Sequence, residues 1–231
     1  MHSNLFINAF LLEYLFYTEE HMFLEEVDNE LFKYMCSIKD MDIYRKIELV
    51  FKKKGAMDIY EHSKLVADNC VKIAKQYGLC REKCAIASYC HDISQIFEPS
   101  IILDYFIEKN FFVDNSERKM PFLLHQRCSA IFAYESLEIK DFNILTAIGC
   151  HTTLKSNPSK YDLALFVADK LSWDTEEIFE LYDEVSRALE SSLCHAAYAY
   201  INYMIRNGKI VERHIWLNDA IEWLEKNYIF R

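Results

Sequence analysis

The segment Cys90-His91-Asp92-Ile93-Ser94 places a histidine and an aspartate side by side at the end of a predicted helix. Small residues stand below His91 on the same helix face, which predicts that the doublet is buried. Neighbouring side chains on a helix point about 100° apart, so the two cannot hold one ion as an i, i+4 pair does. Near a helix end they can reach two ions. The segment therefore predicts a helical protein with a metal site at a helix end.

Further histidines and an aspartate extend this pattern along the chain in both directions. Each stands at the start or end of a predicted helix whose other inward positions are apolar. A single core histidine is usually a hydrogen-bonded structural residue, but six metal-capable groups in order on inward faces favour a shared site. The six predicted ligands are His62, His91, Asp92, His125, His151 and Asp169.

The arrangement that we expect is a pair of divalent transition-metal ions bridged by Asp92. In it, one ion is held by His62, His91 and Asp169, and the other by His125 and His151. Two ions roughly 3.5–4 Å apart lower the pKa of a shared water and absorb charge on a leaving oxygen. The pattern thus predicts hydrolysis of a phosphoester or phosphoanhydride by a metal-bridging hydroxide, with His91 and Asp92 as catalytic residues.

The composition predicts an all-α fold. The 231 residues are 52% hydrophobic and 15% aromatic, with only 4 glycines and 3 prolines, whereas sheet-rich folds need frequent turn residues. The buried segment 163–168 is apolar on every side, and Asp169 continues it. We expect helices ended by Gly78 and capped by Asp141. The predicted organisation is a helical extension (1–40), a metallohydrolase core (41–175) and C-terminal helices packed on that core (176–231).

Charge and cysteine content limit the partners and the compartment. The net charge of -10 argues against binding to nucleic acid, whose phosphates are held by clustered Lys and Arg. The apolar run 5–16 is interrupted by Asn8 and Glu13 and is shorter than the roughly 20 residues of a spanning helix, so we expect a packing helix and no membrane anchor. Eight cysteines without a disulfide-like spacing favour a reducing, cytoplasmic location.

Several residues near the predicted ligands are candidates for contact with substrate. Thr152 and Thr153 follow His151 in a turn, where hydroxyl and free backbone N–H groups can bind phosphate. The polar stretch 114–119 is a candidate covering loop. The nearest basic residues are expected to be solvated surface charges, although Lys170 is kept as a substrate candidate; they are Arg127, Lys155, Lys160 and Lys170. The other histidines are expected to be structural or exposed: His2, His21, His195 and His214.

Five short motifs in this order resemble the HD-domain metal-dependent phosphohydrolases, and within them the YqeK type. The resemblance covers roughly residues 58–174 and rests on Glu61-His62-Ser63, Cys90-His91-Asp92-Ile93-Ser94, Leu124-His125, His151-Thr152-Thr153 and Ala168-Asp169-Lys170. It implies an HD-domain helical bundle with a di-iron-like centre, in which the same six residues are ligands. Iron is therefore the expected metal, with Mn, Co, Ni or Zn as alternatives. The YqeK type is similar to symmetrical hydrolases that split diadenosine tetraphosphate into two ADP.

The chain departs from the family pattern at three places. Gln95 stands where the family commonly has a lysine, and Ile59 stands where it usually has an arginine. The stretch 170–174 replaces an Ile-Glu-Pro-like sequence. These changes leave the six ligands intact, and they add Gln95 to the substrate candidates.

The leading hypothesis is a metal-dependent phosphohydrolase that cleaves a small-molecule nucleotide, diadenosine tetraphosphate first. A nucleotide monophosphatase or phosphodiesterase would use the same site with a different pocket. A nucleotide-binding regulator with weakened turnover is a third reading, motivated by Gln95. The last is a helical interaction module whose segment 1–40 docks a partner or a second copy, and a homodimer is compatible with any of these.

Overall fold

Helices and the turns between them account for the part of the chain that the computed structural model describes, residues 23–172 and 179–229, and no strand occurs there. The prediction of an all-α protein is confirmed. In chain order the α-helices are α2 (Phe23–Val27), α3 (Asn29–Ser37), α4 (Ile43–Lys54), α5 (Met57–Tyr77), α6 (Arg81–Cys90), α7 (Pro99–Glu108), α8 (Asn115–Lys119), α9 (His125–Glu135), α10 (Phe142–Cys150), α11 (Lys160–Lys170), α12 (Phe179–Ser191), α13 (Leu193–Arg206) and α14 (Ile215–Leu224). Short helical turns complete the order: η1 (Ile93–Ile96), η2 (Pro121–Leu124) and η4 (Glu225–Ile229).

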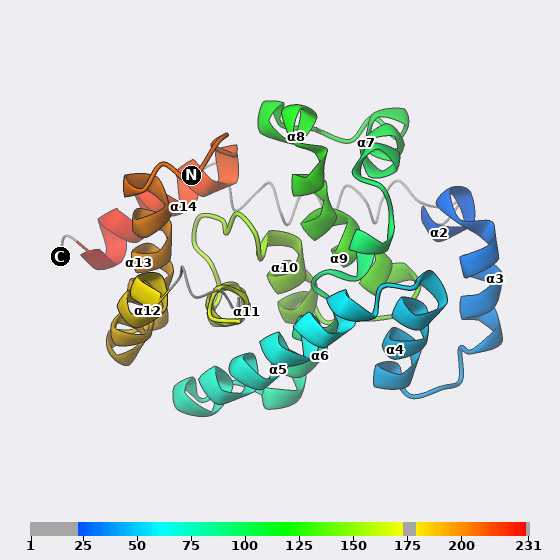
Figure 1. The fold of residues 1–231 in the computed structure, drawn as a ribbon, viewed down its shortest axis with the longest axis horizontal. Helices are drawn as coiled ribbons and strands as arrows, with labels where there is room; N and C mark the ends of the chain where they lie inside the picture. Colours follow the sequence, from blue (N-terminus) through cyan, green and yellow to red (C-terminus); the bar gives the residue numbers. More distant parts are fainter. Residues whose placement is uncertain (1–22, 173–178, 230–231) are drawn as a thin grey trace.

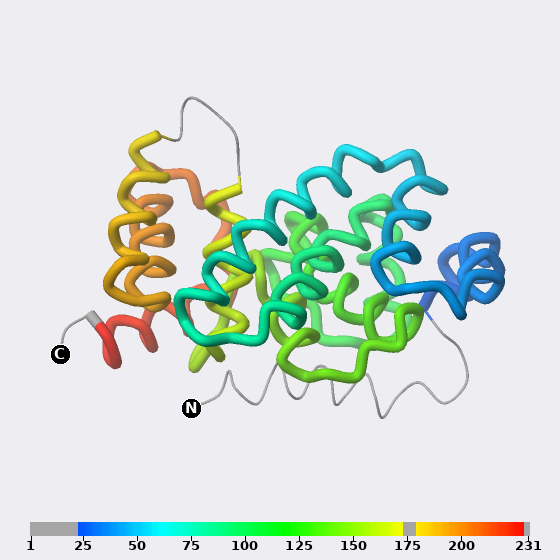
Figure 2. The backbone as a smooth tube through the Cα atoms, turned by 90° about the horizontal axis from the view of Figure 1, so that it is seen from below, coloured from blue at the N-terminus to red at the C-terminus, as the bar shows by residue number. Residues whose placement is uncertain are grey.

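The helices are arranged along the long axis of the molecule, with α2 and α3 at one end and α12 to α14 at the other (Figures 1 and 2). Between these ends α11 packs against α5, α10 and α13. Every residue of the segment 162–170 is buried, which confirms the prediction of a buried helix. The helix that ends with Asp169 and Lys170 is therefore enclosed by its neighbours.

Local capping interactions fix the helix ends that position the predicted site. Gly78, at φ 68°, ends α5, and its backbone N–H donates to the Ala74 carbonyl. Asp141 caps α10 by accepting from the Asn143 N–H. Both ends agree with the sequence prediction. A capping box of Ser159 and Asp162 starts α11, because each side chain accepts a backbone N–H of the other residue.

The first described helices pack onto the same apolar core as the rest. Phe23 and Leu24 are fully buried, and the Phe23 ring contacts the rings of Phe97 and Tyr105 edge to face. The predicted packing helix at 5–16 and the histidines His2 and His21 lie outside the described residues, and the predicted domain boundaries stay predictions. Among the described helices, none has both the length and the apolar character needed to cross a bilayer.

Three of the four basic residues expected at the surface are buried instead. Their side chains each meet a carboxylate that is also buried, and this pairing offsets the cost of removing the charges from water. The pairs are Arg127 with Glu117 at 3.0 Å, Lys155 with Asp162 at 2.9 Å and Lys170 with Asp169 at 2.6 Å. The prediction of solvated charge is wrong for these three, and Lys160 is exposed as predicted.

The Glu117–Arg127 pair joins the C-terminal helices to the core. The stretch expected to be a covering loop is the short helix α8, begun by a capping box of Asp114 and Glu117. Glu117 is fully buried, and His214, the N-cap residue of α14, lies 3.4 Å from it. The Arg127 guanidinium also lies over the Phe106 ring, 4.7 Å from its centroid. Helices α8, α9 and α14 thus meet at one buried carboxylate.

Replacing Glu117 with glutamine should lower the free energy of unfolding by about 3 kcal/mol at neutral pH, because Arg127 is left without its buried counter-charge. Burial alone would raise the pKa of Glu117, but Arg127 and His214 together lower it below 4.5. A depressed pKa contributes stability above the unfolded-state value, and this contribution is lost as pH falls through the folded-state value. The free energies of unfolding of wild type and E117Q, measured by urea denaturation, should therefore become more similar below about pH 4.5.

The matched control is Asp183→Asn, which removes one partner of the exposed Arg187–Asp183 pair. That change should stay within about 0.5 kcal/mol at every pH. Equal, small effects for both variants would show that the buried pair does not hold α8, α9 and α14 together.

Candidate metal centre

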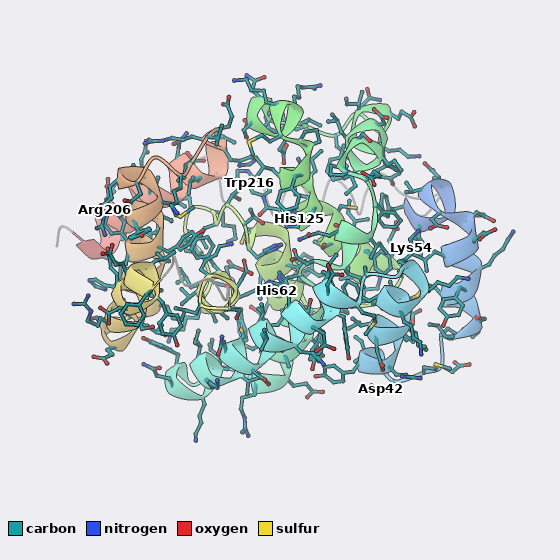
Figure 3. All side chains as sticks on the ribbon, viewed as in Figure 1. Asp42, Lys54, His62, His125, Arg206 and Trp216 are labelled. Carbon is teal, nitrogen blue, oxygen red and sulfur yellow. The ribbon has the colours of Figure 1, made fainter. Side chains whose placement is uncertain are left out.

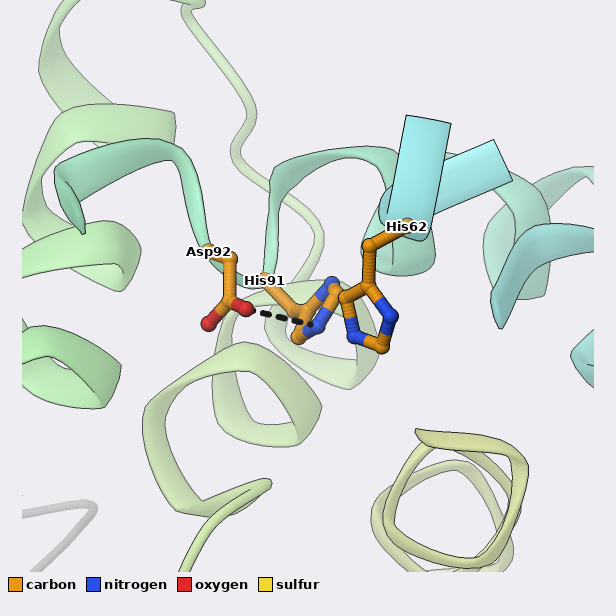
Figure 4. A group of neighbouring side chains, drawn as sticks. All are labelled: His62, His91 and Asp92. Carbon is orange, nitrogen blue, oxygen red and sulfur yellow. Dashed lines mark ion pairs between the residues drawn. The ribbon is translucent and has the colours of Figure 1, made fainter. Parts of the chain in front are cut away.

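The His91-Asp92 doublet lies in the turn between α6 and η1. The sequence predicts that this helix continues to Asp92, but α6 ends at Cys90, and Asp92 has left the helical conformation at φ −110° and ψ 13°. This change of direction aims both side chains into the interior beside His62 of α5 (Figure 4). The His91-Asp92 doublet therefore lies at a helix end, which is the position expected for two adjacent residues that contact two ions.

The turn is tied to the start of α9, where the next predicted ligand stands. The Ser94 hydroxyl donates to the His125 carbonyl at 2.8 Å, and the Ser94 backbone N–H donates to the Ser129 hydroxyl at 3.1 Å. His125 is the first residue of α9, and His151 directly follows α10. Figure 3 shows His62 and His125 toward the middle of the molecule. Helix ends from separate parts of the chain thus meet around the doublet.

Three of the histidines are oriented by the same backbone contact. In each, Nδ1 lies within 2.8 Å of the carbonyl oxygen three residues earlier, which belongs to Ser88 for His91, to Phe122 for His125 and to Ile148 for His151. A carbonyl oxygen only accepts, so each Nδ1 carries the hydrogen. When such a ring is neutral, its Nε2 presents a lone pair that can bind a metal, and a hydrogen-bonded Nδ1 is the usual companion of such a ligand.

The Nε2 atoms converge on the Asp92 carboxylate. Nε2 of His125 and Nε2 of His151 lie 3.0 Å apart, and they lie 3.2 Å and 3.3 Å from Asp92 Oδ1. Neither His91 Nε2 nor Asp92 Oδ1, both buried, makes a hydrogen bond to any described residue. Lone pairs that face one another at this distance repel unless a positive centre lies between them. The donor set therefore fits a divalent cation.

A second convergence involves Asp169, from the last turn of α11. Its Oδ1 lies 3.1 Å from His62 Nε2 and 3.7 Å from His91 Nε2, and its Oδ2 accepts from Lys170 Nζ at 2.6 Å. Lys170 therefore forms an ion pair with Asp169, the last of the six predicted ligands along the chain. The structure brings all six predicted ligands together, five of them buried and His62 half-buried.

The two carboxylates of the site favour positive charge beside them, which a proton on His91 or a bound cation can supply. Burial alone would lower the pKa of His91, but the carboxylates of Asp92 and Asp169 raise it to about 10. Burial lowers the pKa of His151 to about 4, which leaves its ring neutral. Burial alone would raise the pKa of Asp92, and the neighbouring histidines instead hold it well below its usual range. The two carboxylates are therefore ionised at neutral pH, as metal ligands must be.

Three overlapping groups of side chains have ligand atoms within 4.8 Å of one another: His62, His91 and Asp92; Asp92, His125 and His151; and His91, His151 and Asp169. Asp92 belongs to the first two, which is the sharing that a bridging carboxylate needs. His91 and Asp169 share the third group with His151, which was expected on the other ion. The assignment of ligands to two ions stays a prediction.

A pocket of about 360 Å³ opens onto these residues; we call it the central pocket. Five of the six predicted ligands line it, all but His91, together with Asp58, Ile59, Gln95, Phe122, Thr152 and Lys170. Gln95, Thr152 and Lys170 therefore line the same pocket as five of the predicted ligands, and their contact with substrate stays a prediction. Thr153 is buried behind the turn and does not line this pocket.

The sequence did not point to Gln126, which organises the turn after His151. Its Oε1 accepts from the backbone N–H groups of Thr152 at 3.0 Å and Thr153 at 3.2 Å. These N–H groups are not free for phosphate as expected, and the Thr152 hydroxyl, 3.2 Å from His125 Nε2, is the polar group of the turn next to the ligands. A buried glutamine beside a ligand histidine is the only sequence signal that could have identified this role.

Comparison with known proteins agrees with this geometry. The model of the HD domain family matches residues 59–174. An uncharacterized protein in the pepC 5′ region of Lactococcus lactis subsp. cremoris is 43% identical over 109 residues, which is 47% of this chain and 55% of that protein. The symmetrical bis(5′-nucleosyl)-tetraphosphatase of Halalkalibacterium halodurans is 30% identical over 114 residues, covering 48% of this chain and 58% of the enzyme. The chain thus spans little more than half the length of these curated relatives.

A solved structure extends the similarity over more of the fold. It is the crystal structure of a predicted HD superfamily hydrolase involved in NAD metabolism from Clostridium acetobutylicum. The two structures superpose with a TM-score of 0.70 at 25% sequence identity, over 79% of this chain and 97% of the other. The helical arrangement that surrounds the six residues is therefore shared with an HD hydrolase.

Replacing Asp92 with asparagine should remove most of the metal affinity, because Asp92 is common to two of the ligand groups and is the carboxylate nearest the facing Nε2 atoms. Loss of an outer-shell partner costs about 10- to 100-fold in metal affinity, so we expect a loss of more than about 100-fold here. Titration with Mn²⁺ or Fe²⁺ and elemental analysis of the purified protein would measure it.

The matched control is His195→Ala, which removes a histidine whose ring contacts Ser192 at the start of α13. This variant should bind metal as wild type does. Unchanged metal content in D92N, or an equal loss in H195A, would contradict the assignment.

Proposed function

The chain belongs to the HD domain family, and from this we propose that it is a metal-dependent phosphohydrolase that cleaves dinucleoside polyphosphates, splitting diadenosine tetraphosphate symmetrically into two ADP. The observation that carries the proposal is the convergence of the Nε2 atoms of His125 and His151 on Asp92 Oδ1, with ring nitrogens 3.0 Å apart. A mostly buried set of imidazole nitrogens and carboxylate oxygens fits divalent transition metals. We propose two such ions, with iron as the first candidate and Mn, Co, Ni or Zn as alternatives.

Two ions held there would supply positive charge for the phosphate oxygens and would lower the pKa of a water molecule. The residues of the chain provide the conditions for this chemistry. Asp92 and Asp169 are ionised, and the backbone contacts of the histidine Nδ1 atoms fix their ring orientations. Fixed ligands cost little reorganisation during the reaction.

The chain itself brings little free positive charge to the site. Its net charge is -10, and Lys170 is already paired with Asp169. The remaining groups that line the central pocket and suit a phosphate chain are the Thr152 hydroxyl and the Gln95 amide. Bound cations would therefore neutralise most of the negative charge of the phosphates. This agrees with Gln95, an uncharged residue at the position where the family commonly has a lysine.

Two further cavities adjoin the central pocket, and Phe122 lines all three. One, of about 330 Å³, shares Phe122 and Thr152 with it, and the other, of about 170 Å³, shares Gln95, Phe122 and His125. A substrate with a group on each side of its phosphate chain can use both. This arrangement, together with the symmetrical tetraphosphatase among the relatives, supports a dinucleoside polyphosphate rather than a mononucleotide.

The reaction adds one water molecule across the central phosphoanhydride. The water oxygen forms a bond to phosphorus, and the bond from that phosphorus to the bridging oxygen breaks. The two water protons pass to the new terminal phosphates of the two ADP molecules or, at higher pH, to solvent. In water enriched in ¹⁸O, one of the two ADP molecules should carry the label.

The test is product analysis of diadenosine tetraphosphate after incubation with protein loaded with Fe²⁺, Mn²⁺ or Co²⁺. We expect ADP as the product, with activity lost in D92N and retained in H195A. Formation of ATP and AMP would contradict symmetrical cleavage. Cleavage of mononucleotides alone would assign the chain to the monophosphatases, and no cleavage with any of these metals would reject the proposal.

A further inference from the structure

The larger cavity beside the central pocket lies between the family-matched core and the C-terminal helices, and most of its lining residues follow the part of the chain that matches the family model. We call it the C-terminal pocket; its volume is about 330 Å³, and its walls come from α13, the turn after α13, η2 and the turn after α10, with one residue each from α11 and α14. This volume lies at the lower end of the roughly 300–1,000 Å³ typical of small-molecule sites. The family match ends at residue 174, so α13 and the turn after it follow the part of the chain that matches the family model.

The walls of the C-terminal pocket are mainly apolar and aromatic, while its rim is polar. Tyr200, Ile201 and Met204 line it from α13, and the Tyr200 ring packs edge to face with Phe166 at 5.5 Å. Lys209 and Glu212 stand in the turn that follows α13. Aromatic and apolar walls with a few polar groups are suited to a flat ring whose edges carry hydrogen-bonding groups. A nucleobase has this chemistry, and a phosphate or a sugar alone does not.

The C-terminal pocket is next to the reacting centre. It shares Phe122 and Thr152 with the central pocket, and the Thr152 hydroxyl lies 3.2 Å from Nε2 of His125. The Phe122 ring lies on the His125 ring, with centroids 4.5 Å apart, yet Phe122 remains 46% exposed. A large aromatic side chain that is held on one side and exposed on the other is a platform on which a base can stack.

The rim is held in place by contacts to the core. Glu212 pairs with Lys119 of α8 at 2.7 Å, and His214 lies beside the buried Glu117. Gly208 begins the turn at φ 63°, a conformation that side chains with a Cβ rarely adopt. These contacts keep the turn 208–214 over the apolar wall of α13, so the C-terminal pocket is present before any ligand binds.

We propose that the C-terminal pocket binds one nucleobase of the substrate, with the attached phosphates in the central pocket. The proposal rests on the proposed function, because it takes the phosphate chain to lie at the metal centre. The smaller cavity lined by Gln95, at about 170 Å³, has about half the volume and is the weaker candidate for a purine. The base is therefore recognised by residues of α13 and the turn after it, while the phosphates are recognised by the shared metal site.

The experiment compares the binding of ADP with the binding of pyrophosphate, which has the phosphates but no base. Calorimetry would use Mn²⁺-loaded wild type and Met204→Trp, in which the indole fills the C-terminal pocket. We expect ADP affinity to fall at least about tenfold, because base contacts of this kind are worth about 1–3 kcal/mol, and pyrophosphate affinity to be unchanged. Asn202→Trp is the matched control, since Asn202 is exposed on the same helix and lies about 200° around it from Met204.

Val211→Trp provides a second variant that spares the core, because Val211 lines the same cavity and is 80% exposed. It should also weaken ADP more than pyrophosphate. Equal loss of both ligands, or unchanged ADP affinity in both pocket variants, would overturn the proposal. So would wild-type protein that binds ADP no more tightly than pyrophosphate.

These outcomes are separate from the outcome for the proposed function. If no phosphoanhydride is cleaved but ADP binds more tightly than pyrophosphate, and Met204→Trp removes the difference, the pocket assignment stands while the hydrolase proposal fails. If diadenosine tetraphosphate is cleaved but the pocket variants bind ADP as wild type does, the hydrolase proposal stands and the pocket assignment fails.

Discussion

The facing lone pairs around Asp92 are the constraint on which the rest of this structure depends. Two imidazole nitrogens 3.0 Å apart, with a carboxylate oxygen within 3.3 Å of each, form an arrangement that a core of apolar side chains cannot stabilise. Each ring uses its one hydrogen on a backbone carbonyl, so no hydrogen remains to separate the two nitrogens. A positive centre between them relieves the repulsion, and a divalent ion is a partner that this set of atoms fits.

The helical framework supplies the rigidity that such a site requires. A helix end lets a side chain leave the helix direction while its backbone remains anchored, and most of the converging residues stand at or near such an end. The buried helix α11 and the hydrogen bonds of Ser94 and Gln126 fix the positions of these helix ends relative to one another. An ion that binds only the folded protein adds its binding free energy to the stability of this arrangement, so the cost of assembling the site is offset when the site is filled.

The sequence predicted the six converging residues and the all-α class because both follow from local spacing. Histidine and aspartate at helix ends, few glycines and a uniformly apolar segment before Asp169 are visible in the order of residues. The buried partners of Arg127 and Lys155 were not predicted, since they come from other elements and only the packed structure brings them together. The same holds for Gln126, whose role depends on a turn 26 residues away. The sequence predicted that the helix reaches Asp92, but α6 ends at Cys90. Asp92 leaves the helical conformation where it meets residues from other helices, and such contacts cannot be predicted from local helix propensity.

The separation between the donor atoms and the C-terminal pocket has a consequence for how specificity can change in this fold. The donors lie on α5 to α11, whereas the apolar wall lies on α13 and is joined to the core through Glu117, Arg127 and His214. Substitutions on α13 that line the pocket can alter which group is held beside the phosphates without moving a ligand, because no predicted ligand stands on that helix. Substitutions at the buried Glu117 act differently, since they release α14 and the turn before it together. Under the two proposals, selectivity in this chain is set by the helices that follow the shared core, and the chemistry by the helix ends within it.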